Sequence, residues 1–374
     1  MIFNLVGKGF QDSSDISDLN VTSKDIMKDK VSISKDGTPI VGEAPFEYIG
    51  TEDGIDNYRV LEDEMYVLLP NNEKKLLKAG YINVDDEWTQ TTLPLRALLY
   101  SVCYGNGKYV AVDYYKHNIS VYSTDGINWT QTTLPVSANW NSVCYGNGKY
   151  VAVAYNSNIS AYSTDGITWT QTTLPKSQYW RSVCFGNGKF VAVAENTNIA
   201  AYSTDGITWT QFTLPSSSRW FSVCYGNGKF VIITYNSNIS AYSTDGITWT
   251  QSILSASTLW YSVCYGNGKY VAVDSGSNKA TYSTDGINWT QTTLPVSANW
   301  NSVCYGNGKY VAVAYNSNIS TYSEDGITWT QTTLPKACWH SVCYGNDKFV
   351  AVAYEDRNIA AYKKSYSYNG LVLV

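Results

Sequence analysis

One motif occurs seven times between residues 87 and 362, at a spacing of about 40 residues, and it limits what this chain can fold into. Repetition at such a period is typical of solenoids and propellers. We number the copies repeats 1 to 7 by a cysteine that each carries at the same place: Cys103, Cys144, Cys184, Cys224, Cys264, Cys304 and Cys343. No helical periodicity interrupts the array.

Each repeat divides into four short strands, as repeat 2 illustrates. Its strands are predicted at residues 142–146, 149–155, 159–164 and 168–174. Asn147-Gly148 joins the first two strands and Asp165-Gly166 joins the last two. Such dipeptides favour tight hairpin turns, because both central residues need positive φ. Four-stranded meanders repeating at this length are typical of β-propeller blades.

The two ends of the array differ from the rest. A lone fourth strand, residues 88–94, precedes repeat 1, whereas repeat 7 has second and third strands ending near Tyr362 and no fourth. We predict that residues 88–93 complete repeat 7, because a closed ring leaves no free strand edge. An open solenoid would need atypical capping repeats, and none is visible. The predicted fold is all-β, a seven-bladed β-propeller of four-stranded blades closed by an N-terminal strand.

The third-to-fourth-strand turn of each repeat, Ser163 to Trp169 in repeat 2, resembles the Asp-box of sialidase-like propellers. It departs from that pattern because Asp165 and Gly166 are adjacent here. In that family the motif is a structural turn far from the catalytic centre. The resemblance implies that Ser and Asp satisfy the turn backbone while Trp packs between blades. It implies propeller architecture and not sialidase chemistry.

Cysteine usage and the apolar segments indicate the compartment. Thiols at equivalent places around a ring are expected to be buried and free, and not disulfides or metal ligands. No apolar run approaches the ~18 residues that span a bilayer, so no membrane insertion is expected. The N-terminus lacks the basic start and apolar core of a signal peptide. We expect folding in a reducing cytoplasm.

Charge is uneven along the chain. Residues 1–87 hold 9 basic and 18 acidic residues, and residues 88–374 hold 17 basic and 13 acidic ones, for the overall net charge of −5. Neither part is extreme enough to suggest a nucleic-acid partner.

Comparison of the repeats with one another places a candidate binding face. The Gly-Asn-Gly-Lys and Asp-Gly turns hardly vary, whereas the blade-to-blade loops and the second-to-third-strand turns do. In an up-and-down meander these variable segments all lie on one face, where recognition is expected. The candidate ligand-binding residues are Trp140, Trp180, Trp220, Trp260, Trp300, Trp339, Asn139, Gln178, Tyr179, Arg181, Arg219 and Asn299.

The roles of these candidates remain open at this point. The tryptophans, for which repeat 1 has Leu99, either wedge between blades or stack on sugar rings beside amides that bind hydroxyl groups. Arg181, Arg219 and Lys176 either hold an acidic group or are solvated surface charges.

Catalysis finds little support in the sequence. The sequence contains two histidines, His117 and His340. No Ser-His-Asp constellation therefore recurs in the repeats, and no histidine-rich spacing typical of a metal site is present. Most repeat acids lie in turns, so paired catalytic carboxylates are not apparent. We therefore expect no enzyme, no catalytic residues, no metal site and no cofactor.

Residues 20–43 resemble a short motif of phage and prophage tail-fibre proteins. Thr22, Asp25, Ile26, Lys30, Gly37, Val41 and Gly42 fit that motif, and Asp29 departs from it. The resemblance implies a particle-attachment segment. The predicted domains are residues 1–84, an N-terminal particle-attachment region with a β-hairpin around Pro70; residues 85–365, the propeller; and residues 366–374, a C-terminal tail strand.

These features together predict a baseplate or tail-fibre component of a phage or phage-like particle, assembled in the bacterial cytoplasm. The N-terminal region would contact other tail or baseplate proteins. The propeller would act as a receptor-binding adhesin for a host cell-surface carbohydrate or surface protein. Two alternatives remain, a purely structural or decoration protein of the particle and a free-standing lectin.

Overall fold

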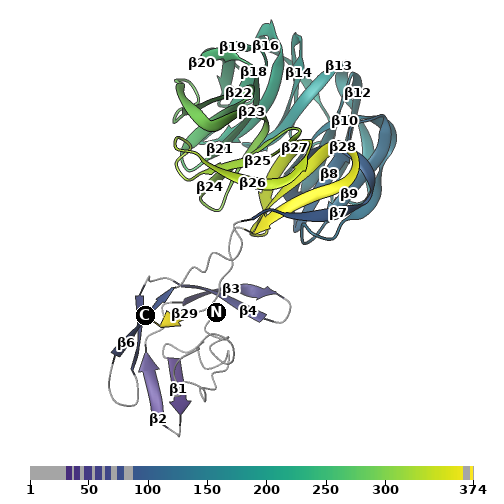
Figure 1. Ribbon diagram of the computed structural model, residues 1–374. Helices are drawn as coiled ribbons and strands as arrows, with labels where there is room; N and C mark the ends of the chain where they lie inside the picture. The colour runs from purple at the N-terminus through teal and green to yellow at the C-terminus, as the bar shows by residue number, and fades with distance from the viewer. Residues whose placement is uncertain are drawn as a thin grey trace. The chain divides into compact units, whose positions relative to one another are not determined.

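The computed structural model describes residues 87–364, and outside them the strands 31–35, 38–42, 46–52, 55–60, 64–68, 74–79 and 371–373. The chain divides into two compact units (Figure 1). Unit 1 comprises Met1–Val84 and Tyr366–Val374, and unit 2 comprises Asp85–Ser365.

Unit 1 contains short antiparallel strands: β1 (Val31–Lys35), β2 (Thr38–Gly42), β3 (Phe46–Glu52), β4 (Ile55–Val60), β5 (Glu64–Leu68), β6 (Lys74–Ala79) and β29 (Leu371–Leu373). β1 pairs with β2 and β3 with β4, while β6 lies between β5 and β29. Of the tail-like motif, Val41 and Gly42 belong to β2, whereas Thr22, Asp25, Ile26, Asp29, Lys30 and Gly37 lie outside the described residues.

Unit 2 consists of antiparallel strands throughout. They are β7 (Thr89–Gly105), β8 (Lys108–Asp113), β9 (His117–Ser123), β10 (Thr130–Gly146), β11 (Lys149–Tyr155), β12 (Ser157–Ser163), β13 (Thr170–Gly186), β14 (Lys189–Glu195), β15 (Thr197–Ser203), β16 (Thr210–Ser218), β17 (Trp220–Gly226), β18 (Lys229–Thr234), β19 (Ser237–Ser243), β20 (Thr250–Thr258), β21 (Trp260–Gly266), β22 (Lys269–Ser283), β23 (Thr290–Gly306), β24 (Lys309–Ala314), β25 (Ser317–Ser323), β26 (Thr330–Ala337), β27 (Trp339–Gly345) and β28 (Lys348–Lys364).

The strands pair in sets of four. β17, β18, β19 and β20 form one set by themselves, in chain order. Long strands such as β10 serve two sets, since its first half pairs with β9 and its second half with β11. At the chain ends, Thr89 to Thr92 of β7 pair with Tyr362 to Ile359 of β28. Figure 1 shows these first and last strands of unit 2, blue and yellow, side by side.

The second strand of each set forms the core. In repeat 2, Tyr150, Val151, Ala152, Val153 and Ala154 are all fully buried. A continuous apolar run is what a strand needs when sheets cover both of its faces. Side chains from neighbouring sets pack between the sheets, so that Val151 and Val153 contact the cluster around Trp180.

The Gly-Asn-Gly turn satisfies two separate demands. Asn147 and Gly148 have φ of 46° and 72°, as the tight hairpin requires. The preceding Gly146 is needed for packing, because a Cβ there would lie 2.0 Å from Cγ of Phe185 in the next repeat. This aromatic ring therefore lies directly against the Gly146 backbone.

The Asp-Gly turns are fixed by their own side chains. In repeat 2 the N–H of Gly166 donates to Ser163 Oγ at 2.8 Å. The N–H groups of Ile167 and Thr168 donate to Asp165 Oδ1, both at 2.8 Å. The predicted role of Ser and Asp in satisfying the turn backbone is confirmed.

Serine side chains join the innermost strands of neighbouring repeats. The N–H of Val183 donates to Ser142 Oγ of the preceding repeat at 3.1 Å. Six equivalent bonds run from Val102 to Ser341, Val143 to Ser101, Val223 to Ser182, Val263 to Ser222, Val303 to Ser262 and Val342 to Ser302. These bonds fix the spacing of the innermost strands.

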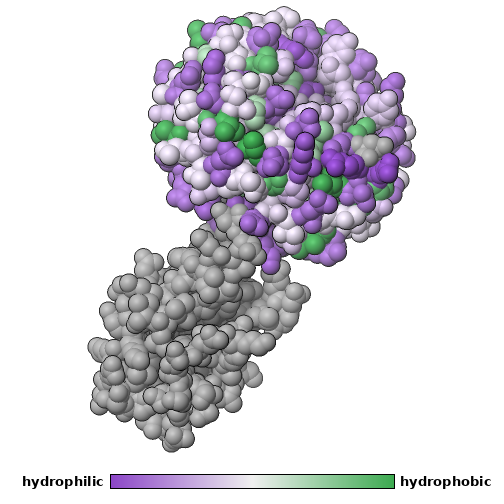
Figure 2. Space-filling model, in the orientation of Figure 1, coloured by the Kyte–Doolittle hydropathy of each residue, from purple (hydrophilic) through white to green (hydrophobic). Residues whose placement is uncertain are grey.

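Figure 2 shows isolated apolar side chains on the visible surface of unit 2 and no single large apolar patch. The exposed large apolar residues are Tyr115, Tyr179, Ile207 and Ile253. Scattered apolar residues of this kind are normal for a protein surface.

Candidate functional site

The six tryptophans predicted as ligand-binding residues lie in the core. Trp140, Trp180, Trp220, Trp260, Trp300 and Trp339 are all fully buried. Each indole N–H donates to the carbonyl four residues earlier, as from Trp140 to Val136 at 3.2 Å. A buried ring with its N–H occupied cannot stack on a ligand, so this expectation is corrected: these residues wedge between sheets.

The residue after each of these tryptophans is positioned differently. The pairing of β10 with β11 shifts register between Trp140 and Ser142, so Asn141 is an extra, bulged residue. The shift recurs in every repeat, with Leu99 in the place of Trp in repeat 1. Bulges re-aim side chains and are common beside active sites. The bulge residues are Tyr100, Asn141, Arg181, Phe221, Tyr261, Asn301 and His340.

The bulge residues meet although their repeats are not neighbours. Tyr261 Oη of repeat 5 lies 3.0 Å from His340 Nε2 of repeat 7. The Arg181 guanidinium of repeat 3 lies 5.2 Å from the ring centroid of Tyr100 in repeat 1. Contacts across this span place the side chains at the centre, where the innermost strands converge.

A second set of residues follows the second strand of each repeat. This strand-end set comprises Tyr114, Tyr155, Glu195, Tyr235, Ser275, Tyr315 and Tyr354. Its rings contact the bulge residues, with Tyr100 stacked on Tyr114 at 4.7 Å and Phe221 on Tyr235 at 5.1 Å.

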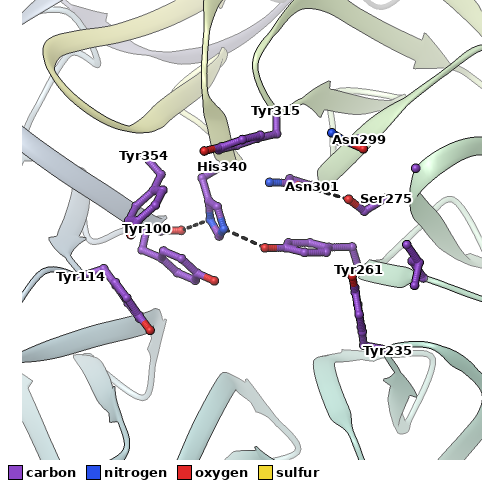
Figure 3. Close-up of a pocket in the computed structure, with 12 residues that line it drawn as sticks. Tyr100, Tyr114, Tyr235, Tyr261, Ser275, Asn299, Asn301, Tyr315, His340 and Tyr354 are labelled. Atoms are coloured by element: carbon purple, nitrogen blue, oxygen red, sulfur yellow. Dashed lines mark hydrogen bonds between the residues drawn. The ribbon is translucent and has the colours of Figure 1, made fainter.

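Most members of the two sets line a cavity of about 490 Å³; Asn141, Tyr155, Arg181, Glu195 and Phe221 are not among the lining residues. Figure 3 shows aromatic rings and polar groups surrounding an open space. The lining residues are Tyr100, Tyr114, Tyr235, Leu259, Tyr261, Ser275, Gly276, Asn299, Asn301, Tyr315, His340 and Tyr354. A volume in this range, with aromatic walls and a few convergent polar groups, is typical of a small-ligand site.

His340 has a defined protonation state in this cavity. Burial and the charge of Arg181 lower the pKa of His340 to about 3, against the hydrogen bond to the Tyr100 carbonyl. The imidazole is therefore neutral at physiological pH. Nδ1 lies 2.7 Å from that carbonyl oxygen, which can only accept, so Nδ1 carries the proton. Nε2 must then accept from the hydroxyl of Tyr261 (Figure 3).

Two arginines share one carboxylate beside the cavity. Arg181 Nε lies 3.3 Å from Glu195 Oε1, and Arg219 Nε lies 3.1 Å from Glu195 Oε2. The side chain of Glu195 is 3% exposed, that of Arg181 10% and that of Arg219 43%. The Arg181 guanidinium also lies 3.9 Å from the Phe221 ring centroid. The sequence left open whether Arg181 and Arg219 are freely solvated surface charges. The structure shows that neither is, because both contact Glu195.

The other predicted residues are spread around the same face. Asn299 lines the cavity. Asn139 accepts a hydrogen bond from the Lys116 N–H at 3.0 Å. Tyr179 is 41% exposed and its ring centroid lies 5.0 Å from that of Tyr155 in a tilted arrangement, and Gln178 lies opposite Ser157.

Sequence reasoning missed Tyr100, Tyr261, Asn301 and His340. One signal could have found them. The residue after Trp varies among the repeats while its neighbours hardly change, and such a position inside an otherwise uniform strand indicates a functional constraint.

The cysteines do not form a reactive or metal-binding site. All eight are free, and burial raises the pKa of each of the seven equivalent thiols. In the part of the chain that the structure describes, no group of three or more His, Cys, Asp and Glu could hold a metal ion.

No helix among the described residues is long and apolar enough to cross a membrane.

Comparison with known proteins identifies the fold. No protein-family model and no curated protein matches the chain. Among solved structures, virginiamycin B lyase from Staphylococcus aureus is 16% identical with a TM-score of 0.66, covering 74% of this chain and 99% of the lyase. A streptogramin B lyase is 14% identical with a TM-score of 0.67, covering 74% and 97%. YCF48 bound to the D1 peptide is 16% identical with a TM-score of 0.60, covering 76% and 97%.

These likenesses correct one expectation. The prediction that the chain is not an enzyme is contradicted, because two of these structures are lyases. At identities near 15% the similarity concerns the arrangement of the strands and no particular reaction. By the fold it shares with these proteins, the chain is a β-propeller protein.

Proposed function

We propose that unit 2 is a closed seven-bladed propeller that binds a cell-surface carbohydrate in its central cavity, as part of a phage or phage-like tail. The observation that carries the proposal is the cavity of about 490 Å³, with its tyrosine walls and amide and hydroxyl groups.

Strand pairing and side-chain bonds support closure of the ring. The pairing of Thr89 with Tyr362 gives repeat 7 its fourth strand. The bond from Val102 N–H to Ser341 Oγ links the innermost strands of repeats 1 and 7 as their equivalents link all other neighbours. A ring without free edges is a rigid frame for side chains at its centre.

The cavity chemistry suits a polyhydroxylated ligand. Tyrosine rings offer flat apolar surfaces with polar tips, which match the apolar faces and hydroxyl groups of sugar rings. Ser275, Asn299 and Asn301 add hydroxyl and amide groups that both donate and accept. Tyrosine, serine, glycine and asparagine also dominate antibody binding surfaces, because they give large contact areas at small entropic cost.

The chain ends of unit 2 support the particle assignment. Thr89 and Tyr362 pair where the other repeats have an Asp-Gly turn, at the end of the strands opposite to Ser275 and Gly276 of the cavity. Thr89 and Tyr362, near the two ends of unit 2, therefore lie on the face opposite to the cavity. Weak single sites can act strongly when a particle presents many copies.

Glycan arrays and host-cell fractions probed with the full chain test this proposal. Asn299→Trp should fill the cavity and abolish binding. Asn139→Trp is a matched control, because repeats 2 and 6 are identical around these residues and only Asn299 lines the cavity. Failure of the unmodified protein to bind any host fraction would contradict the proposal.

Two alternatives make different predictions. A purely structural or decoration protein would have its cavity face covered by a neighbour in the particle. A free-standing lectin would bind its ligand without needing residues 1–84 for assembly. Imaging of the chain in a particle distinguishes both from a tail-associated adhesin.

A catalytic role is the second candidate function. Its support is the bond between the Tyr261 hydroxyl and His340 Nε2 inside the cavity, in a fold that lyases also use. Hydroxyl and imidazole groups in this relation can move a proton. Product formation from bound polysaccharide, lost in Tyr261→Phe while binding remains, would establish the role.

A further inference from the structure

We infer that the ligand of the cavity carries an anionic group, a carboxylate or a phosphate, which the guanidinium of Arg219 holds. The inference rests on the proposed carbohydrate-binding function and narrows its ligand class to acidic glycans. The sequence left open whether Arg219 holds an acidic group or is a solvated surface charge.

The ion-pair geometry leaves one positive charge without compensation. Arg181 and Glu195 belong to repeat 3 and form a buried pair, which is neutral by itself. Arg219 comes from the following loop and binds the second oxygen of the same carboxylate. Two guanidinium groups against one carboxylate leave a net charge of about +1 in this group of three residues, which lies behind the lining residues Tyr100, Tyr235 and Tyr261.

Arg219 is oriented to use that charge. Only its Nε has a hydrogen-bond partner among the described residues, which leaves its two Nη groups available. The guanidinium lies 4.3 Å above the ring centroid of Tyr235, a residue of the cavity wall. Glu195 and Tyr235 hold the group from two sides, so little side-chain freedom is lost when its outer edge receives a bidentate anion.

The acids at or next to the corresponding strand ends belong to repeats 1, 5 and 7. Asp113 accepts from the Leu98 N–H at 2.8 Å and contacts His117. Asp274 is 1% exposed and accepts from Thr258 and Ser277, while Glu355 pairs with Arg357. None of them is paired with Arg219, whose acidic partner among the described residues is Glu195, bound through Nε alone.

The test measures binding of a matched ligand pair to the full chain. The probes are a hexuronate oligosaccharide and the same oligosaccharide with its carboxylates reduced to alcohols; a phosphorylated oligosaccharide distinguishes phosphate from carboxylate. We expect the anionic probe to bind tenfold to a hundredfold more tightly, as charge-assisted hydrogen bonds provide on this order. Its affinity should fall as salt is added.

Variants of Arg219 distinguish bidentate hydrogen bonding by the guanidinium from the effect of its positive charge alone. Arg219→Gln should remove the preference for the anionic probe, and Arg219→Lys should restore only part of it because lysine lacks the bidentate edge. Lys176→Ala removes an exposed charge from the preceding blade-to-blade loop and should leave the preference unchanged. Thermal unfolding checks that the partly exposed Arg219 site tolerates substitution.

The outcomes distinguish this inference from the proposed function. Equal binding of the two matched probes would overturn the anionic ligand and leave carbohydrate binding standing. An unchanged preference in Arg219→Gln would overturn the role of Arg219. Failure of every probe and every host glycan would overturn both proposals.

Discussion

The Oγ of Ser341 accepts a hydrogen bond from the N–H of Val102 at 3.2 Å, although 239 positions separate the two residues. The corresponding bond within the array, from Val183 N–H to Ser142 Oγ, measures 3.1 Å. The contact between the first and last repeats is therefore made in the same way as a contact between consecutive repeats.

Removal of these hydroxyl groups tests whether the two contacts are equivalent. Ser341→Ala and Ser142→Ala each leave a backbone N–H without its acceptor, at a cost of about 1–3 kcal/mol. Urea unfolding of the full chain should show similar losses for both. If Ser341→Ala left the free energy of unfolding unchanged while Ser142→Ala lowered it, the ring would be open between repeats 1 and 7 in solution.

The tryptophans are expected to contribute to stability. Trp180→Ala removes a fully buried ring, and we expect a loss of about 3–5 kcal/mol in the free energy of unfolding. Tyr179→Ala, at the neighbouring exposed position, should change it by no more than about 0.5 kcal/mol. Thermal unfolding of both variants measures the difference. Comparable effects would contradict the assignment of Trp180 to the core.

Acid should destabilise unit 2 through its turn aspartates. Burial raises the pKa of Asp165, but hydrogen bonds from the N–H groups of Thr168 and Ile167 outweigh it and lower the pKa to about 2. Asp125 and Asp245 also have a pKa of about 2. The unfolded value is ~3.9. A lowered folded pKa gives stability that is present above pH ~4 and lost as the pH falls toward 2.

The melting temperature measured between pH 5 and 2 checks this sign. Asp165→Asn keeps an acceptor oxygen and removes the titration, so its melting temperature should fall less steeply over that range. An identical slope in the variant would show that the turn carboxylates do not control acid unfolding.

His340 should add a separate pH dependence at higher pH. Burial first, and then Arg181, lower its pKa to about 3, whereas an unfolded histidine titrates near ~6.5. Its stabilising effect is therefore complete above pH ~6.5 and is lost as the pH falls toward 3. His340→Gln should flatten the stability curve between pH 6.5 and 4. NMR titration showing a protonated His340 at pH 5 would contradict the assigned neutral state.

Local pattern was sufficient to predict the strands and turns. Asn147-Gly148 and Asp165-Gly166 mark hairpins whose chemistry is contained in a few adjacent residues. Counting strands also predicted a partner for residues 88–93, because repeat 7 lacked one. These inferences need no knowledge of packing between repeats.

The cavity depends on relations that the pattern does not contain. Trp180 and Arg181 are adjacent, but a one-residue register shift directs one into the core and the other to the centre. Both would be read as surface loop residues from their variable surroundings. The contact of both Arg181 and Arg219 with the carboxylate of Glu195 likewise depends on the geometry of two consecutive repeats.

The bulged residue varies among the repeats, whereas the residues on either side of it recur. The Trp, Ser and Gly positions on either side recur around the array and pack or bond neighbouring repeats, whereas the bulged side chain takes no part in the backbone pairing of its strand. Duplication or exchange of whole repeats within the gene can thus reshuffle the central side chains while every junction stays compatible. Such a protein can acquire a new specificity in one genetic step, and repeats 2 and 6, still identical across the bulge, are what a recent copying event would leave behind.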